Sequence, residues 1–258
     1  MTLVLSLFPG IGLLDMAFEE EGFCVVRGPD LLWGGDIRNF HPPAGKFDGV
    51  IGGPPCQAFS RLRHIVEANG YQTAPNLIPE FERIVAEARP TWFLMENVPE
   101  APQPVVKAYG VVDQLIRDVW VGGDTDRLRR FSFGSKLARN ILDAPCNNFL
   151  IETLALHRPD PEHSALASGG GRPVPVAVGG NGKRKISHKS ALKNYGYKTG
   201  DAFTNHLRLQ GLPPDFLADA PFTVAGKIKA VGNGVPLPMG RAVAKAVKRA
   251  LNLHERAA

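Results

Sequence analysis

The sequence predicts an α/β fold in which a mixed, mostly parallel β-sheet has helices on both faces and carries a small inserted region. Short apolar segments alternate with amphipathic helical segments, as in parallel sheets covered on both faces. Glycine and proline residues follow the apolar segments and mark the turns. At 258 residues the chain can bury one substantial core, so one domain with an insertion is expected in preference to two equal domains.

The N-terminal part of the chain contains most of the predicted sheet. The apolar run 3–8 predicts a strand, which Pro9-Gly10 ends. A helix is predicted next, because apolar residues recur at helical spacing opposite acidic ones: Leu13, Leu14, Ala17 and Phe18 against Asp15, Glu19, Glu20 and Glu21. Further strands are expected at 23–26, 48–51 and 91–95, and a further helix at 77–88.

Polar residues follow three of these predicted strands. Asp30 comes after the second strand, Cys56 after the third and Glu96 after the fourth. In sheets of this kind ligands bind beyond the carboxyl ends of the strands. These residues are therefore candidates for one site.

The regular pattern weakens after Gly134 and returns near Ala202, and it ends with a helix predicted from about Pro238. This predicts a main domain formed by residues 1–134 and 202–258, with an insertion at 135–201. Residues 164–200 contain no Asp or Glu but seven Lys and Arg residues. Such a stretch is either a solvated basic loop or a surface that contacts phosphates.

Composition narrows the class of protein. No apolar run approaches the roughly 18 residues that a membrane span needs, and the apolar N-terminus is expected to be a buried strand, not a signal peptide. The three cysteines are odd in number and widely spaced, which favours a reducing cytosol over a disulfide framework or a zinc site. The net charge of +5 is compatible with an acidic partner such as nucleic acid.

Two loops contain candidate functional residues. The turn FPGIG, at 8–12, would let backbone amides approach a ligand, although many tight turns share this pattern. In GGPPCQAFS, at 52–60, glycine and proline hold Cys56 on a stiff loop at a strand end. A single cysteine usually packs in a core, but this setting favours a fixed, reactive thiolate. Glu96, in MENVP, could reach the same ligand or could be a structural acid.

Taken together and in order, these motifs resemble those of the cytosine-5 DNA methyltransferase family. The resemblance covers nearly the whole chain outside the insertion and rests on five short motifs: LSLFPGIG at 5–12, Gly35-Asp36-Ile37, Pro55-Cys56-Gln57, Glu96-Asn97-Val98 and Gly232-Asn233-Gly234-Val235-Pro236. It implies the Rossmann-like fold of S-adenosylmethionine-dependent methyltransferases. It also implies that the insertion is a short target-recognition region.

The resemblance implies a set of residues that bind S-adenosylmethionine. Phe8 would lie against the adenine, Asp36 and Ile37 would hold its edge, and Gly10 and Gly12 would admit the methionine part. Further contacts are expected from Pro54, Asn76, Leu77 and Asn233. The family's usual ribose-binding Glu is absent, and Asp30 is its expected substitute. Ser6 stands where the family usually has an Asp.

The resemblance also implies the chemistry. Cys56 would add to carbon 6 of a flipped-out cytosine in double-stranded DNA, and Glu96 would donate a proton to the ring. Arg127 and Arg129 resemble the paired arginines that position the cytosine and the catalytic carboxylate, while Thr125 stands where a Gln is usual. No metal is expected, and a monomer on DNA is the default.

Other functions are compatible with parts of this pattern. A transfer-RNA cytosine-5 methyltransferase would share the motifs, although the Cys-Phe-Thr block of that branch is absent from the sequence. A catalytically silent DNA-binding homologue would not need Cys56 and Glu96, and a nicotinamide dehydrogenase would leave Pro-Cys-Gln and Glu-Asn-Val without a role. A partner in a restriction system, an anti-restriction enzyme and an orphan enzyme all fit the sequence.

Overall fold

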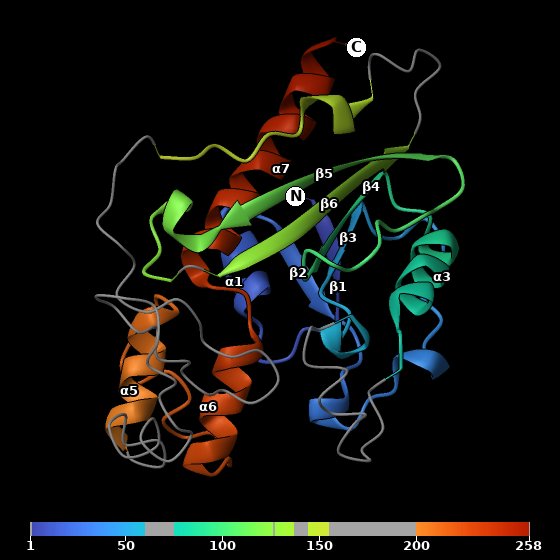
Figure 1. Ribbon diagram of the computed structural model, residues 1–258. Helices are drawn as coiled ribbons and strands as arrows, with labels where there is room; N and C mark the ends of the chain where they lie inside the picture. The colour runs from blue at the N-terminus through green and yellow to red at the C-terminus, as the bar shows by residue number, and fades with distance from the viewer. Residues whose placement is uncertain (1, 60–74, 126, 137–143, 155–199, 258) are drawn as a thin grey trace. The chain divides into compact units, whose positions relative to one another are not determined.

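The computed structural model describes residues 2–59, 75–125, 127–136, 144–154 and 200–257 and contains a six-stranded sheet (Figure 1). The strands lie in the order β2-β1-β3-β4-β6-β5. All pairings among β1, β2, β3 and β4 are parallel, whereas β4 and β6 are antiparallel. The prediction of a mixed, mostly parallel sheet is confirmed. The strands are β1 (Leu3–Leu7), β2 (Cys24–Arg27), β3 (Gly49–Gly52), β4 (Trp92–Asn97), β5 (Tyr109–Arg117) and β6 (Leu128–Lys136).

Five α-helices occur in the described part of the chain: α1 (Leu13–Glu20), α3 (Ile78–Ala88), α5 (Gly200–Leu209), α6 (Val224–Asn233) and α7 (Leu237–Ala257). All four predicted strands and the predicted helices are present, with ends shifted by one or two residues. Neither β5 nor β6 was predicted. β5 lies at the edge of the sheet and its residues are mostly half-buried, so its sequence lacks a clean alternation of apolar and polar positions.

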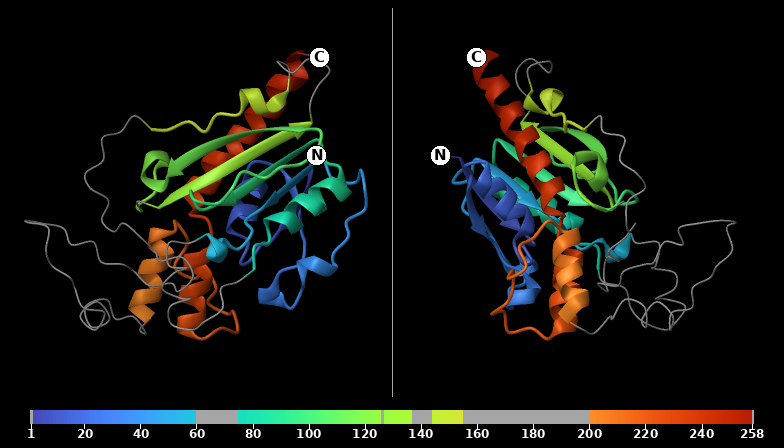
Figure 2. Two further views of the ribbon diagram at one scale, coloured as in Figure 1. Left: turned by 45° about the vertical axis from the view of Figure 1, so that its right-hand side comes forward. Right: turned by 90° about the vertical axis from the view of Figure 1, so that its left-hand side faces the viewer.

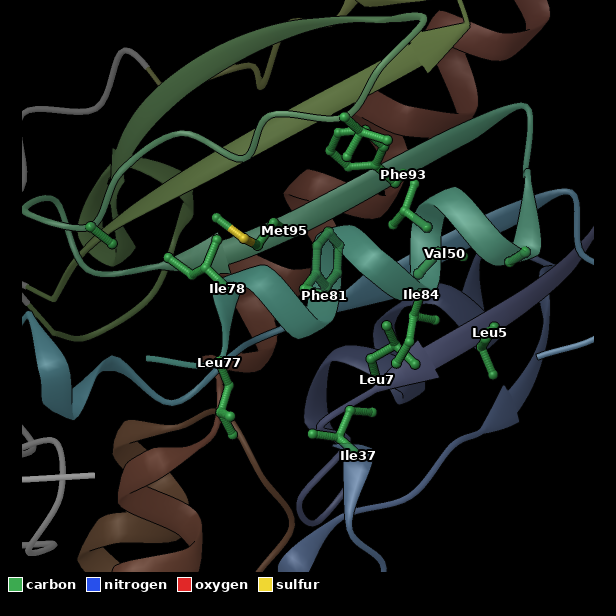
Figure 3. Close-up of a cluster of buried hydrophobic side chains, with 14 of the residues drawn as sticks. Leu5, Leu7, Ile37, Val50, Leu77, Ile78, Phe81, Ile84, Phe93 and Met95 are labelled. Carbon is green, nitrogen blue, oxygen red and sulfur yellow. The ribbon is translucent and has the colours of Figure 1, made fainter. Parts of the chain in front are cut away.

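Helices cover both faces of the sheet, as Figures 1 and 2 show. On one face α3 contributes Phe81 and Ile84 to a core that includes Leu5, Val50 and Phe93 of the strands (Figure 3). On the other face Trp92 of β4 stacks on Phe18 of α1, with 6.2 Å between ring centroids. Helix α7 packs on α1, where Arg241 pairs with Glu20 at 2.6 Å.

Adjacent residues of β4 point to opposite faces of the sheet, as the strand geometry requires. Two glycines make room for the rings of Trp92 and Phe93. A Cβ atom on Gly49 would lie 2.1 Å from the Trp92 ring, and one on Gly134 would lie 2.2 Å from the Phe93 ring. These close approaches explain why strands β3 and β6 contain glycine where β-branched residues are usual.

The chain divides into two compact units. The first comprises Met1–Ile116, Leu128–Glu152 and Gly240–Ala258, and the second comprises Arg117–Arg127 and Thr153–Met239. This division differs from the boundaries at 134 and 201 predicted from the sequence. Phe149, at the start of the predicted insertion, stacks on Phe133 of β6 with 4.7 Å between centroids, so this stretch packs with the sheet. Residues 155–199, most of the insertion, lie outside the described residues, and their role in target recognition stays a prediction.

The second unit contains a fully buried carboxyl group. Asp118 begins the 3₁₀ turn η4 (Asp118–Val121) and accepts hydrogen bonds from the Thr125 hydroxyl at 2.7 Å and the Thr125 amide at 3.1 Å. Thr125 is the residue that stands where the family usually has Gln. Burial raises the pKa of Asp118 from 3.8 to about 6, although the hydrogen bonds from Thr125 oppose this shift.

This raised pKa predicts a pH-dependent stability. Because the folded state binds the Asp118 proton more tightly, the stabilisation is complete below about pH 4 and is lost as the pH rises through about 6. The difference amounts to about 3 kcal/mol. We expect Asp118→Asn to match the wild type in stability near pH 3.5 and to exceed it by up to about 3 kcal/mol at pH 7.5. Denaturant titrations at the two pH values measure this, and a stability difference that does not change with pH would contradict it.

No helix in the described part of the chain is long and apolar enough to cross a membrane.

Candidate active site

The carboxyl ends of β1, β3 and β4 meet at one edge of the sheet. The register pairs Leu7 of β1 with Gly52 of β3, and Gly52 with Met95 of β4. The loops that follow these three strands therefore begin side by side. Phe8 directly follows β1 and Cys56 follows β3, while Glu96 is the last residue but one of β4.

Cys56 opens the 3₁₀ turn η3 (Cys56–Ala58), and its main-chain carbonyl accepts a hydrogen bond from the Phe59 amide at 2.9 Å. Its side chain is half-buried and packs against the core that contains α3. The loop before it is tied to β4, because the buried Asn97 amide donates to the Pro54 carbonyl at 3.1 Å. Asn97 thus fixes the Cys56 loop against the strand that carries Glu96. Asn97 belongs to the motif Glu96-Asn97-Val98, but no local pattern indicated this contact.

Glu96 lies beside the Cys56 loop and pairs with Arg129. A Cβ atom on Gly53 would lie 3.0 Å from Glu96 Oε2, so a larger residue there would crowd the carboxylate. Arg129 Nε donates to Glu96 Oε1 at 2.9 Å, and both side chains are nearly buried, with exposed fractions of 10% and 13%. The antiparallel register explains the pairing, since it places the start of β6 opposite the end of β4. A charge-assisted bond in such a dry setting is stronger than its exposed counterpart.

Arg127 contacts main-chain carbonyls at the end of α6. Its Nη1 donates to the Gly232 carbonyl at 2.6 Å and its Nη2 to the Asn233 carbonyl at 3.4 Å. The buried Gln210 amide donates to the carbonyls of Val231 and Gly234. Four consecutive carbonyls at the end of α6 are thus bound by two side chains, which satisfies groups that a helix end leaves unpaired. Arg127 therefore holds the turn that contains Asn233, another predicted site residue, whereas Arg129 contacts Glu96.

The glycine turn after β1 has an unusual backbone. Phe8 has φ of 55°, which is costly for a residue other than glycine and is common at functional sites. Gly10, also at φ 55°, would carry a Cβ atom with nothing within 4 Å, so the space beside it is open. Gly12, at φ 81°, caps α1 without any side-chain hydrogen bond. The backbone of this turn is therefore open to a ligand beside Gly10.

Asp30 holds this turn. Its carboxylate accepts hydrogen bonds from the Gly10 amide at 2.9 Å and the Leu32 amide at 2.7 Å. Trp33 Nε1 donates to the Gly10 carbonyl at 2.7 Å, so the peptide groups on either side of Gly10 are fixed. Sequence reasoning missed Trp33. A carboxylate can accept about four hydrogen bonds, and Asp30 therefore retains capacity for a ligand hydroxyl.

Asp15 corrects one expectation. It was predicted on the solvent face of α1, but it is fully buried and accepts hydrogen bonds from the Ser6 hydroxyl at 2.5 Å and Arg27 Nε at 2.9 Å. Its helical position borders that of Phe18, which is the signal that could have indicated burial. Burial raises its pKa, while Ser6 and Arg27 oppose the shift. The carboxylate missing from position 6 is thus supplied from α1.

The two remaining groups of predicted cofactor contacts flank α3. Asp36 caps the 3₁₀ turn η2 (Ile37–Asn39), and its carboxylate pairs with Arg38 at 2.6 Å, which lowers the pKa of Asp36. Asn76 Oδ1 accepts from the Ile78 amide at 3.0 Å at the start of α3. Leu77 and Ile37 belong to the same core cluster (Figure 3).

Residues 60–74, in the loop after Cys56, lie outside the described residues. Among the residues that are described, no group of three or more His, Cys, Asp or Glu side chains could hold a metal ion.

The sequence was compared with those of known protein families and proteins. Residues 33–107 match the family model of C-5 cytosine-specific DNA methylase. The chain is 32% identical over 118 residues to Type II methyltransferase M.HgiGI of Herpetosiphon aurantiacus, a match that covers 38% of this chain and 90% of that protein. It is 32% identical over 170 residues to Type II methyltransferase M.FnuDI of Fusobacterium nucleatum, covering 54% of this chain and 48% of that one.

Several solved structures have a similar fold. The structure of the S. pombe Dnmt2 methyltransferase superposes on this one with a TM-score of 0.56 over 99% of both chains, at 14% identity. This likeness concerns the fold alone. The chain spans about half the length of M.FnuDI. From the family model and the match to M.HgiGI, the chain belongs to the C-5 cytosine-specific DNA methylase family.

Proposed function

We propose that this protein transfers a methyl group from S-adenosylmethionine to carbon 5 of a cytosine flipped out of double-stranded DNA. The observation that carries the proposal is the Glu96 carboxylate, nearly buried, paired with Arg129 and lying against Gly53 of the loop that holds Cys56. A nucleophile and an acid at one sheet edge are what this reaction needs. Family membership supports the same chemistry.

The reaction begins with removal of the cytosine from the base stack, which costs about a few kcal/mol. The Cys56 thiolate then forms a bond to carbon 6, and Glu96 in its carboxylic acid form donates a proton to ring nitrogen 3 and becomes a carboxylate. The electron pair thereby reaches carbon 5, which would take the methyl group as its bond to the sulfur of S-adenosylmethionine breaks and S-adenosylhomocysteine leaves. Loss of the carbon 5 proton to water or hydroxide restores the double bond and expels the Cys56 thiolate, while nitrogen 3 returns its proton to Glu96.

Arg129 and Asn97 act by position in this scheme. Arg129 keeps the Glu96 carboxylate in one orientation, and the guanidinium is itself fixed by a 2.7 Å hydrogen bond from its Nη1 to the Leu128 carbonyl. Asn97 keeps the Cys56 loop beside β4. Fixing both groups before the substrate arrives lowers the entropy cost of reaching the transition state.

The residues of the glycine turn fit S-adenosylmethionine, which when bound supplies an electrophilic methyl group on sulfur. The open space beside Gly10 and the uncapped N-terminus of α1 suit the methionine part. Phe8 offers apolar surface for the adenine, and Asp36 offers acceptors for its amino group at the segment that Ile37 anchors in the core. We assign the ribose hydroxyls to Asp30, with further contacts from Gly12, Pro54, Asn76, Leu77 and Asn233.

A methyl-transfer assay tests the proposal. The protein is incubated with S-adenosylmethionine labelled in the methyl group and, separately, with duplex DNA and transfer RNA. We expect label in DNA as 5-methylcytosine, and sequencing of the product gives the target site. Label in transfer RNA alone would favour the RNA-directed alternative. Binding of DNA without any methyl transfer would favour a silent homologue.

A further inference from the structure

We propose that Arg83 of α3 is a positioning residue for the adenine end of the cofactor site, a role that rests on the proposed function. Arg83 lies outside every motif that identified the site. Its guanidinium contacts the segment that follows Asp36, although it belongs to a helix more than 40 positions later in the chain. The inference therefore concerns how the adenine contacts are held, not which atoms touch the ligand.

The contacts of Arg83 converge on the main chain of the adenine segment. Its Nη2 donates to the carbonyl of Ile37 and to that of Phe40, each at 3.1 Å. The Ile37 carbonyl also accepts from the Phe40 amide at 3.2 Å, which closes η2. One guanidinium nitrogen thus binds both ends of the turn that begins with Asp36 and Ile37.

The other nitrogens of Arg83 are fixed by two carboxylates of α3. Nε pairs with Glu80 at 2.8 Å and Nη1 with Glu87 at 2.8 Å, and the Arg83 side chain is only 27% exposed. Glu87 also contacts His41 Nδ1 at 3.0 Å, one residue after Phe40. The guanidinium is therefore held on the helix, and the adenine segment is held on the guanidinium.

A second set of predicted cofactor contacts lies at the N-terminus of helix α3. Asn76 and Leu77 directly precede it, and Leu77 and Ile37 share one core cluster. Arg83 therefore fixes the distance between the two sides of the site, Asp36 and Ile37 on one side and Asn76 and Leu77 on the other. A small displacement of this segment would weaken recognition of the adenine edge more than recognition of the methionine part at Gly10.

Lysine cannot replace this arginine. The guanidinium presents five donors in a rigid plane, whereas an ammonium group is a single point with three rotatable donors. Lysine at this position could contact one carboxylate or one carbonyl, but it could not span the two carboxylates and the two carbonyls. Arg83→Lys therefore keeps the charge and removes the link between α3 and the adenine segment.

The test compares the affinity of two probes, S-adenosylhomocysteine and S-inosylhomocysteine, in which a carbonyl replaces the 6-amino group of adenine. We expect the wild type to prefer S-adenosylhomocysteine. In Arg83→Lys the dissociation constant of S-adenosylhomocysteine should rise about tenfold and that of S-inosylhomocysteine less than about twofold. The preference for the adenine probe therefore shrinks. The kcat at saturating S-adenosylmethionine should stay within about twofold of wild type.

Two further variants complete the design. Arg249→Lys is the matched control, because Arg249 likewise donates to a carbonyl, that of Leu150, and pairs with a carboxylate, Glu152, outside the site. It should leave both affinities unchanged. The double variant Glu80→Gln, Glu87→Gln keeps Arg83 but weakens its anchors, and it should shift the preference in the same direction by about threefold. This variant decides the question if Arg83→Lys does not fold.

Two kinds of result would overturn the inference. If Arg83→Lys prefers S-adenosylhomocysteine as strongly as the wild type does, or if it binds both probes more weakly by the same factor, then Arg83 does not position the adenine contacts. Failure of the wild type itself to bind S-adenosylhomocysteine would instead overturn the proposed function, and the inference with it.

Discussion

Cys56→Ala should abolish methyl transfer while leaving a folded protein that binds S-adenosylhomocysteine. Without the thiolate no bond forms at carbon 6, and carbon 5 does not become electron-rich enough to accept a methyl group. The loss should be on the order of 10⁵-fold or more, as for other enzymes that lose a nucleophile. Folding should be little affected, because the Cys56 side chain is half-buried and its loop is tied to β4 by Asn97 through a main-chain carbonyl.

The covalent step can be observed directly. When the target cytosine of duplex DNA carries fluorine at carbon 5, there is no proton at that carbon to lose after methyl transfer. The Cys56 adduct should therefore persist and resist denaturation. The wild type should form this adduct, and Cys56→Ala should not. Cys24→Ala is the matched control, since Cys24 lies half-buried on β2 with no proposed role, and it should behave as wild type. Methyl transfer or adduct formation by Cys56→Ala would contradict the assignment.

The parts of the site that could be predicted depend on local sequence. Apolar segments followed by glycine identified β1, β3 and β4, and the rule that ligands bind beyond the carboxyl ends of parallel strands placed Cys56 and Glu96 at one edge. The register confirms that these strand ends are adjacent. The positive φ angles of Gly10 and Gly12 likewise follow from the glycine turn.

The parts that could not be predicted depend on contacts between distant segments. The pairing of Arg129 with Glu96 requires an antiparallel β6, which no local pattern indicated. Arg127 binds carbonyls more than 100 positions away, so these contacts were not visible in its own motif. Asp15 was placed on the solvent face because carboxylates usually lie there, and its burial depends on Ser6 and Arg27 from two neighbouring strands.

The pair Glu96 and Arg129 yields the second large effect. Glu96→Gln keeps the size and the hydrogen-bonding capacity of the side chain but removes the transferable proton. General acid catalysis is worth about 10²- to 10⁴-fold, so the kcat should fall within that range. Arg129→Lys keeps the charge but loses the Nε donor that orients the carboxylate at 2.9 Å, and it should cost about 10- to 100-fold.

A double-mutant cycle separates a shared role from two independent ones. If Arg129 acts through Glu96, then Arg129→Lys should reduce the kcat much less in the Glu96→Gln background than in the wild type, because there is no longer an acid to orient. The exposed pair Arg249 and Glu152, whose atoms are 3.5 Å apart, provides the matched cycle, and its variants should leave the kcat unchanged. Independent, multiplicative losses for Glu96 and Arg129 would mean that Arg129 acts on the cytosine itself and not through the carboxylate.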